Sequence, residues 1–467
     1  MRFSKNHPFI IGMIHVPALP GTPRGSDKIR NILSFVRKEV SIYWNAGVDS
    51  ILVENMHDLP YIQGRDMGPE IVACMTRICS TAKSAFQRRN LAACIDPHEK
   101  MVNSLRALFS ALPGDVQDKA SKVTYSTYFK DGNEYILARF PGLTEEGTGS
   151  TKAEAKTLGL LQLCENLVDE EKLDQKHVIA KYKDEHMEQL TNKTVLQHFN
   201  SYCKEKNLQL QMDAVWDDDQ KKFRGSVYVD GELIGEEFGN SKRGAKLKSC
   251  WKALKTKNYV GIQILAGGNK QALAVAQAAE LDYIRAEGFV YSHVADEGWM
   301  DACAGDLLRY RKIIGAKDVK IFTDIKKKHS AHAVTSDISL VETARAAELF
   351  GSDGVIVTGT ATGVETDPTE VQDVVRSVSI PVLVGSGVTM NNVHKFQSAS
   401  GLIVGSHFKR LQQWDNQINI ARLLKFMLRV RPECVDYDKV FMTPEVVEEE
   451  LSDSNGCYEL DDDLDIK

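Results

Sequence analysis

The sequence predicts an α/β chain, in which a (β/α)8 TIM barrel is interrupted by an α+β insertion of two αβββα modules. Eight short apolar runs each end in polar residues, and a helical pattern follows most of them. Residues 1–90 and 260–431 carry this pattern and hold about 260 residues, near the roughly 250 typical of such a barrel. The region between them contains an internal repeat instead.

The first ninety residues predict two βα units. An apolar run over residues 9–14 ends at His15, and a helical pattern over 29–45 stops at Gly47, a common C-terminal helix signal. A second run over residues 50–53 ends at Glu54, and a second helical segment covers about 69–88. Strands separated by helices pair in parallel, so polar strand ends gather on one face.

The βα pattern resumes near Val260 and supplies the other strand ends. Polar residues follow each apolar run, and we expect them on the same barrel face as Glu54. These candidates are Asn269 after VGIQIL (260–265), Arg285 within LDYIRAEGF (281–289), Asp324 with Lys328 and His329 after VKIFT (319–323), and Thr358 after GVIV (354–357).

The last two strand runs predict a phosphate site. IPVLV (380–384) opens into Gly385, Ser386 and Gly387, and GLIVG (401–405) ends at Gly405 before Ser406, with Lys409 close behind. Bare backbone N–H groups in such turns, at a helix start, converge on anions. In TIM barrels the turns after strands seven and eight often hold phosphate. The alternative interpretation is ordinary strand-to-helix turn chemistry.

The strand-end side chains predict acid–base chemistry. Glu54 and Asp324 are two carboxylates that could share proton transfer or hold a divalent cation. His329 could act as a base near neutral pH, and His15 is either a ligand or a packed strand-end histidine. Lys328, like Arg285, could neutralise a phosphate or a neighbouring carboxylate. No other cofactor is indicated.

Composition favours a soluble cytoplasmic protein. The net charge of −6 gives no reason to expect a generally nucleic-acid-binding surface. Nine cysteines without a C-x-x-C pair fit a reducing compartment and argue against a disulfide framework or a structural zinc site. We find no apolar run long enough to cross a bilayer, and expect no membrane partner. Residues 432–467 are acidic and predicted to be disordered.

Several motifs carry a family resemblance over residues 8–90 and 260–412. The motifs are IGMIHVPALPG (11–21), Glu54-Asn55, LLRYR (307–311), Asp324 with Lys328-His329, VTGTATG (357–363), VLVGSGVT (382–389) and IVGSHFKR (403–410). In this order along the chain, they resemble the BtpA/SgcQ family of barrel proteins, which implies the barrel fold and leaves the reaction open. The large insertion after the second helix departs from the family pattern.

The insertion resembles a pair of double-stranded-RNA-binding domains, at residues 98–172 and 190–258. In the second module, an amphipathic helix over 194–208 and three strand-like runs precede a helix that starts with basic residues. The resemblance implies phosphate contacts, shape readout of duplex RNA and the following contact residues. They are Lys242, Arg243 and Lys246 in the second module, and Lys152 and Lys156 in the first.

The two modules differ in how well they keep this pattern. The second has 13 Lys+Arg against 9 Asp+Glu over residues 192–258, yet places Asp217, Asp218 and Asp219 where a minor-groove loop would lie. The first has 9 against 11 over 100–172, and Ala153 replaces a basic residue. We therefore expect the first module to have a protein-interaction or packing role. For the second module, RNA binding and no RNA binding are equally favoured by the sequence.

Two functions remain open from the sequence. The first is an enzyme, a lyase, isomerase or hydrolase acting on a small phosphorylated metabolite or nucleotide. The second is a non-catalytic scaffold that binds duplex RNA or a protein partner through the insert. Because the insert lies between a helix and the next strand, we expect it to leave from the amino-terminal barrel face, away from the pocket.

Overall fold

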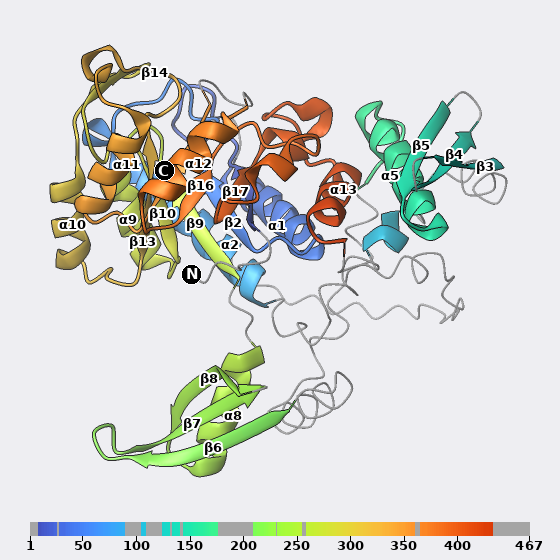
Figure 1. Cartoon of the computed structure of the whole chain (residues 1–467). Coiled ribbons are helices and arrows are strands. Elements are labelled where there is room, and N and C mark those ends of the chain that lie inside the picture. The colour runs from blue at the N-terminus through green and yellow to red at the C-terminus, as the bar shows by residue number, and fades with distance from the viewer. Residues whose placement is uncertain are drawn as a thin grey trace.

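The computed structural model describes the barrel and parts of the insert (Figure 1). The described residues are 8–25, 28–88, 104–108, 124–130, 133–140, 143–175, 209–229, 231–254, 258–359 and 365–432. The predicted helix over 194–208 and the acidic tail beyond residue 432 lie outside them.

Eight parallel strands close into a barrel, which confirms the predicted barrel fold. Their order around the barrel is β1-β17-β16-β15-β13-β10-β9-β2, so β1 pairs with both β2 and the last strand, β17. The strands are β1 (Phe9–His15), β2 (Ser50–Glu54), β9 (Tyr259–Gln263), β10 (Tyr283–Ala286), β13 (Lys320–Ile325), β15 (Gly354–Val357), β16 (Val382–Val384) and β17 (Gly401–Val404).

Alternation along the strands separates the barrel interior from the layer under the helices. Phe9, Ile11 and Met13 of β1 belong to one apolar cluster, which fills the interior with side chains from the other strands. Ile10 and Ile14 belong to the second cluster, which includes the helices. Both faces of β1 are thus buried, as a parallel sheet requires.

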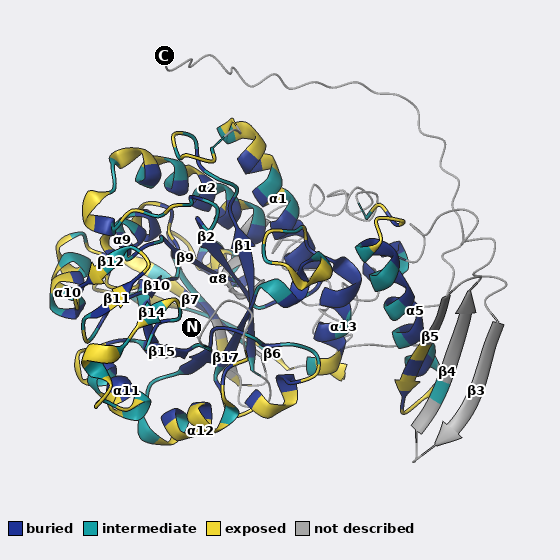
Figure 2. Cartoon of the chain, turned by 90° about the horizontal axis from the view of Figure 1, so that it is seen from above, coloured by how far each residue is buried: buried dark blue, intermediate teal, exposed yellow. Residues whose placement is uncertain are grey.

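Helices cover the outside of the barrel, with their exposed residues facing outward (Figure 2). They are α1 (Ile29–Asn45), α2 (Pro69–Arg88), α9 (Asn269–Ala278), α10 (Ala304–Ile313), α11 (Leu340–Leu349), α12 (Pro368–Ser377) and α13 (Ile420–Val430). Short 3-10 turns are η1 (Gly64–Asp66), η3 (Ala333–Thr335), η4 (Val393–Phe396), η5 (Ser406–Phe408) and η6 (Arg410–Gln412). A small sheet is formed by β11 (His293–Ala295), β12 (Gly298–Met300) and β14 (Ser330–Ala331).

The insert contains two units in which a three-stranded antiparallel sheet precedes a helix. The first has β3 (Thr124–Lys130), β4 (Asn133–Phe140), β5 (Leu143–Gly149) and α5 (Lys152–Asp169). The second has β6 (Leu210–Asp217), β7 (Lys222–Val229), β8 (Glu232–Gly239) and α8 (Lys242–Leu254). Ahead of the first unit's sheet, residues 104–108 are helical.

Both units bring their helix onto the sheet at a glycine. A Cβ on Gly149 would lie 2.7 Å from the backbone nitrogen of Ala155, and one on Gly239 would lie 2.5 Å from that of Ala245. Only glycine permits this approach, so the same device recurs in both units. The βββα order therefore repeats, while the likeness to double-stranded-RNA-binding domains stays a prediction.

Candidate functional site

A cavity opens at the carboxyl ends of the strands. Its volume is about 120 Å³, and it is the place where both predicted turns meet several of the polar strand ends. The lining residues are Met13, His15, Glu54, Met56, Arg285, Lys328, Gly385, Ser386, Gly387, Val388, Thr389, Ile403, Val404, Gly405, Ser406, His407 and Gln412.

Small residues keep the cavity wall at the turn after β16 open. A Cβ on Gly385 would lie 2.6 Å from Ile356 Cγ2, and Gly387 has φ +68°, in the left-handed region that favours glycine. We find no acceptor, among the described residues, for the backbone N–H groups of Gly387 and Val388. Two adjacent amide donors therefore border a cavity that also contains Arg285 and Lys328.

The turns differ in one respect from the sequence expectation. The turn after β16 leads into η4 and the turn after β17 leads into η5, which are 3-10 segments of four and three residues. Neither turn opens an α-helix, so no helix dipole of useful length points at the cavity from them. An anion there would be bound by the turn amides and by side chains.

Arg285 and Asp324 form a buried ion pair. Arg285 Nε lies 3.0 Å and its Nη2 3.1 Å from the Asp324 oxygens, in a fork-like arrangement. Burial opposes the charge on Arg285, but the Asp324 and Glu54 carboxylates outweigh it and raise its pKa. Arg285 thus remains a cation that borders the cavity.

Asp324 does not line the cavity, and its catalytic role stays a prediction. Its carboxylate is bound by Arg285, and its residue borders a smaller hollow with His293 and His332. Among the described residues we find no group of three or more His, Cys, Asp or Glu side chains placed to hold a metal ion. The geometry therefore gives no support to a divalent cation between Glu54 and Asp324.

His15 and Glu54 lie next to each other at the cavity wall. His15 Nδ1 lies 2.8 Å from the Trp414 carbonyl oxygen and donates to it, which leaves Nε2 as an acceptor 3.8 Å from Glu54 Oε2. Burial, with help from Lys409, lowers the pKa of His15 to about 3. Burial also raises the pKa of Glu54, although Arg285 and Lys328 oppose this.

Lys328 faces the same cavity as Glu54. Burial lowers the pKa of its amine, and the positive charge of Arg285 lowers it further. The pKa of the Glu54 carboxyl group is raised and that of the Lys328 amine is lowered, which are the directions of shift that acid–base catalysis uses.

Three predicted ligand residues lie elsewhere. Lys409 Nζ donates to Glu39 Oε1 at 2.6 Å, where both side chains are almost fully buried, so it cannot reach an anion in the cavity. Asn269 holds the backbone of Glu287 through both its amide atoms. Thr358 is packed behind Gly385, and its buried Oγ1 has no hydrogen-bond partner among the described residues.

His329 is also absent from the cavity lining, and its role as a base stays a prediction. Its residue is exposed, and burial of the ring together with Lys328 lowers its pKa. Sequence reasoning missed His407 and Gln412, which do line the cavity. His407 directly follows the second predicted turn, so its position was a usable signal, whereas Gln412 carried none.

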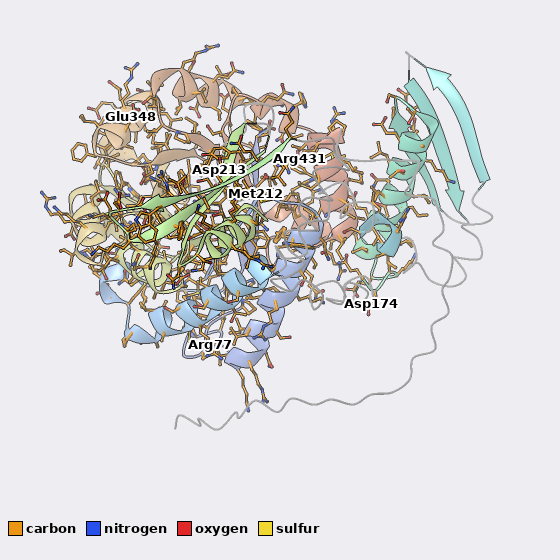
Figure 3. The ribbon with its side chains drawn as sticks, turned by 90° about the horizontal axis from the view of Figure 1, so that it is seen from below. Arg77, Asp174, Met212, Asp213, Glu348 and Arg431 are labelled. Carbon is orange, nitrogen blue, oxygen red and sulfur yellow. The ribbon has the colours of Figure 1, made fainter. Side chains whose placement is uncertain are left out.

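The predicted RNA-binding residues are differently placed. Lys242 and Arg243 are exposed at the start of α8, but Lys246 Nζ donates to the Met212 carbonyl oxygen at 2.8 Å and is partly buried. Met212 lies on β6, where Figure 3 labels it. Lys246 therefore holds its helix on the sheet. Lys152 and Lys156 begin α5, and Lys156 is half-buried.

A closed parallel barrel with a polar cavity at its carboxyl-terminal face defines a TIM-barrel protein. The chain belongs to the BtpA family, whose pattern matches residues 6–88 and 253–431. The match leaves out the insert and confirms the family resemblance predicted from the sequence motifs.

Relatives match either most of this chain or about a third of it. An uncharacterized mitochondrial protein of Caenorhabditis elegans is 32% identical over 427 residues, which cover 91% of this chain and 94% of that protein. So wide a match must take in most of the insert. The photosystem I biogenesis protein BtpA of Synechocystis is 31% identical over 173 residues, 36% of this chain and 58% of that protein.

An uncharacterized protein of Archaeoglobus fulgidus is 34% identical over 152 residues, covering 32% of this chain and 60% of that protein. No helix within the described parts of the chain is both long enough and apolar enough to cross a membrane. The cytoplasmic location stays a prediction.

Proposed function

We propose that the barrel is an enzyme that binds a small phosphorylated metabolite or nucleotide at the carboxyl ends of its strands. The observation that carries this proposal is the shared cavity, in which the turns at 385–389 and 405–407 face Arg285, Lys328 and Glu54. Amide donors and a fixed cation, here Arg285, are groups that bind phosphate oxygens in proteins.

The chemistry of the other wall favours proton transfer. Glu54 holds its proton more strongly than an ordinary carboxyl group, and Lys328 loses its proton more easily than an ordinary amine. Glu54 can therefore donate a proton to one substrate atom while Lys328 removes one from another. Such an acid–base pair supports a lyase or isomerase, with hydrolysis as the remaining alternative.

A variant of Gly387 tests the phosphate site. Gly387→Asp places a carboxylate among the turn amides and should abolish the thermal stabilisation that ribose 5-phosphate gives the wild type. Gly387→Asn places a neutral side chain of the same shape at the same left-handed φ, so it separates charge from backbone strain.

Gly315→Asp is the matched control for the same measurement. Gly315 also has a left-handed φ, +73°, and a Cβ there would meet nothing within 4 Å. This variant should keep the full ligand-induced shift in Tm. If Gly387→Asp keeps it too, the cavity is not the phosphate site.

A second function, duplex RNA binding by the second unit, is favoured by one surface. Lys242 and Arg243 are exposed at the start of α8, and Lys242 Nζ lies 6.0 Å from the ring centre of Phe223, beside the half-exposed Trp216. Two basic residues at a helix start can meet adjacent phosphates. The acidic turn at Asp217–Asp219 adjoins them, so we expect weak binding.

Charge reversal tests this second function on the full chain. Each of the two phosphate contacts should contribute a slope of roughly −0.9 to the plot of log affinity against log salt. Lys242→Glu with Arg243→Glu should abolish binding to a blunt RNA duplex in filter or anisotropy assays. Lys248→Glu, an exposed change further along the same helix, should cause a much smaller loss. Equal losses, or binding that is independent of salt, would favour the protein-binding scaffold instead.

A further inference from the structure

The first inserted unit is docked on the barrel through α5 and α13, which lie side by side in Figures 1 and 2. Leu160, Leu161 and Cys164 of α5 belong to the same continuous apolar cluster as the barrel helices. Ion pairs flank this contact. Arg422 of α13 lies 2.8 Å from Glu165 and 2.5 Å from Asp169.

The end of α5 also reaches the loop that follows the last barrel strand. The backbone nitrogen of Leu411 donates to Asp169 Oδ1 at 3.1 Å. Arg410 Nη2 donates to the Asp169 carbonyl oxygen at 3.2 Å and to Glu171 Oε1 at 2.9 Å. The insert therefore contacts a loop on the cavity side of the barrel, which corrects the expectation that it stays away from the pocket.

This loop has a backbone conformation that needs support. Leu411 has φ 53° and Gln412 has φ 56°, so two successive residues with a Cβ occupy the left-handed region. Such residues cost free energy and persist where surrounding contacts hold them. The hydrogen bond from Leu411 to Asp169 is one of these contacts.

Gln412 connects this loop to the turn after β16 through His407. Gln412 Oε1 lies 3.3 Å from His407 Nδ1, and the backbone nitrogen of Met390 donates to His407 Nε2 at 3.2 Å. Because Nε2 accepts, Nδ1 carries the proton and donates to Gln412. Met390 directly follows Thr389 of the cavity wall. An unbroken series of contacts thus runs from the insert to the cavity.

We infer that Asp169 of the insert is a positioning residue for the anion cavity, acting through Leu411, Gln412 and His407. This inference rests on the proposed function for its ligand, but the positioning itself does not require one. The insert and the barrel then form one binding unit, and ligand binding and α5 docking stabilise each other reciprocally.

Asp169→Ala is the direct test. It removes the acceptor of the Leu411 N–H group and should weaken ribose 5-phosphate binding on the order of tenfold, as coupling through one such contact allows. Asp169→Asn retains an acceptor oxygen for Leu411 while losing the charge that pairs with Arg422, so it should recover most of the affinity.

Glu165→Ala is the matched control. Glu165 pairs with Arg422 and with Lys425 at 2.6 Å, on the same interface, and has no described contact with residues 410–412. It should lower the Tm of the free protein about as much as Asp169→Ala and leave affinity near the wild-type value. Equal loss of affinity in both variants would mean that docking in general matters, and would overturn the role of Asp169.

Hydrogen exchange tests the inference without any ligand. The amides of Leu411 and Met390 should exchange faster in Asp169→Ala than in Glu165→Ala, because only the first variant frees the loop. Unchanged exchange at both amides overturns the inference. If exchange rises as expected but the wild type does not bind ribose 5-phosphate, the proposed ligand is wrong and the positioning role stands.

Discussion

Two buried histidines border the cavity without carrying charge. Burial lowers the pKa of His407 to about 4, although its contact with Gln412 opposes this, and the pKa of His15 falls to about 3. Neither ring is protonated at neutral pH, and hydrogen bonds fix the tautomer of each. The sequence predicted His15 as a strand-end residue but could not predict its charge or tautomer. Its low pKa depends on burial and on Lys409, and its tautomer depends on Trp414, 399 residues away.

The lowered pKa of His407 predicts acid-sensitive stability. In the unfolded chain His407 has an ordinary pKa of 6.5 and binds a proton below that pH. In the folded chain its pKa is about 4, so the ring stays neutral down to about pH 4. Stability is therefore full above pH 6.5 and is lost as pH falls toward 4, and His407 alone should cost about 2 kcal/mol between pH 7 and pH 5.

Urea unfolding at both pH values measures this contribution. His407→Gln removes the titrating ring and should unfold with a smaller difference between the two pH values than the wild type. His15 retains its own contribution, so some difference should remain. An unchanged difference in His407→Gln would show that this ring already titrates normally in the folded protein.

At the scale of elements, strands were predictable and the connections after them less so. Buried parallel strands are continuous apolar runs, as β15 and β17 show, and their boundaries follow from the polar residue after each run. After β16 the chain forms the 3-10 segment η4 and no α-helix, and no residue pattern in the sequence indicated this difference. Nor does composition indicate the left-handed loop at Leu411 and Gln412, which tertiary contacts hold.

Charged side chains were likewise predictable in position but not in their contacts. Lys409 follows a glycine-rich turn and so was predicted to bind phosphate. Its amine instead donates to Glu39 of α1, 370 residues away. Asp324 likewise pairs with Arg285 on the neighbouring strand. The polar residues of a barrel mouth can be found in sequence, but which of them face the cavity depends on which ion pairs form beneath it.

At the scale of the whole molecule, the two inserted units relate differently to the barrel. The first shares the barrel's continuous apolar cluster through α5, and Gln175 beyond it donates to the Ile418 carbonyl oxygen at 2.6 Å. The described hydrogen bonds of the second unit run within it, as from Ser249 Oγ to the Gly225 carbonyl oxygen at 2.7 Å. We therefore expect the first unit to be coupled more strongly than the second to the stability of the barrel.

Matched core truncations measure this coupling. Leu161 of α5 and Val227 of β7 are both fully buried. Leu161→Ala should cost about 2–5 kcal/mol, because it leaves a cavity in a cluster that includes the barrel helices. In calorimetry it should lower the Tm of the barrel transition by several degrees.

Val227→Ala removes only two methyl groups from the second unit and should leave the barrel transition in place while lowering that unit's own transition. If Leu161→Ala spares the barrel transition, the first unit is merely tethered, and its contacts with Arg410 and Leu411 do not hold the cavity loop.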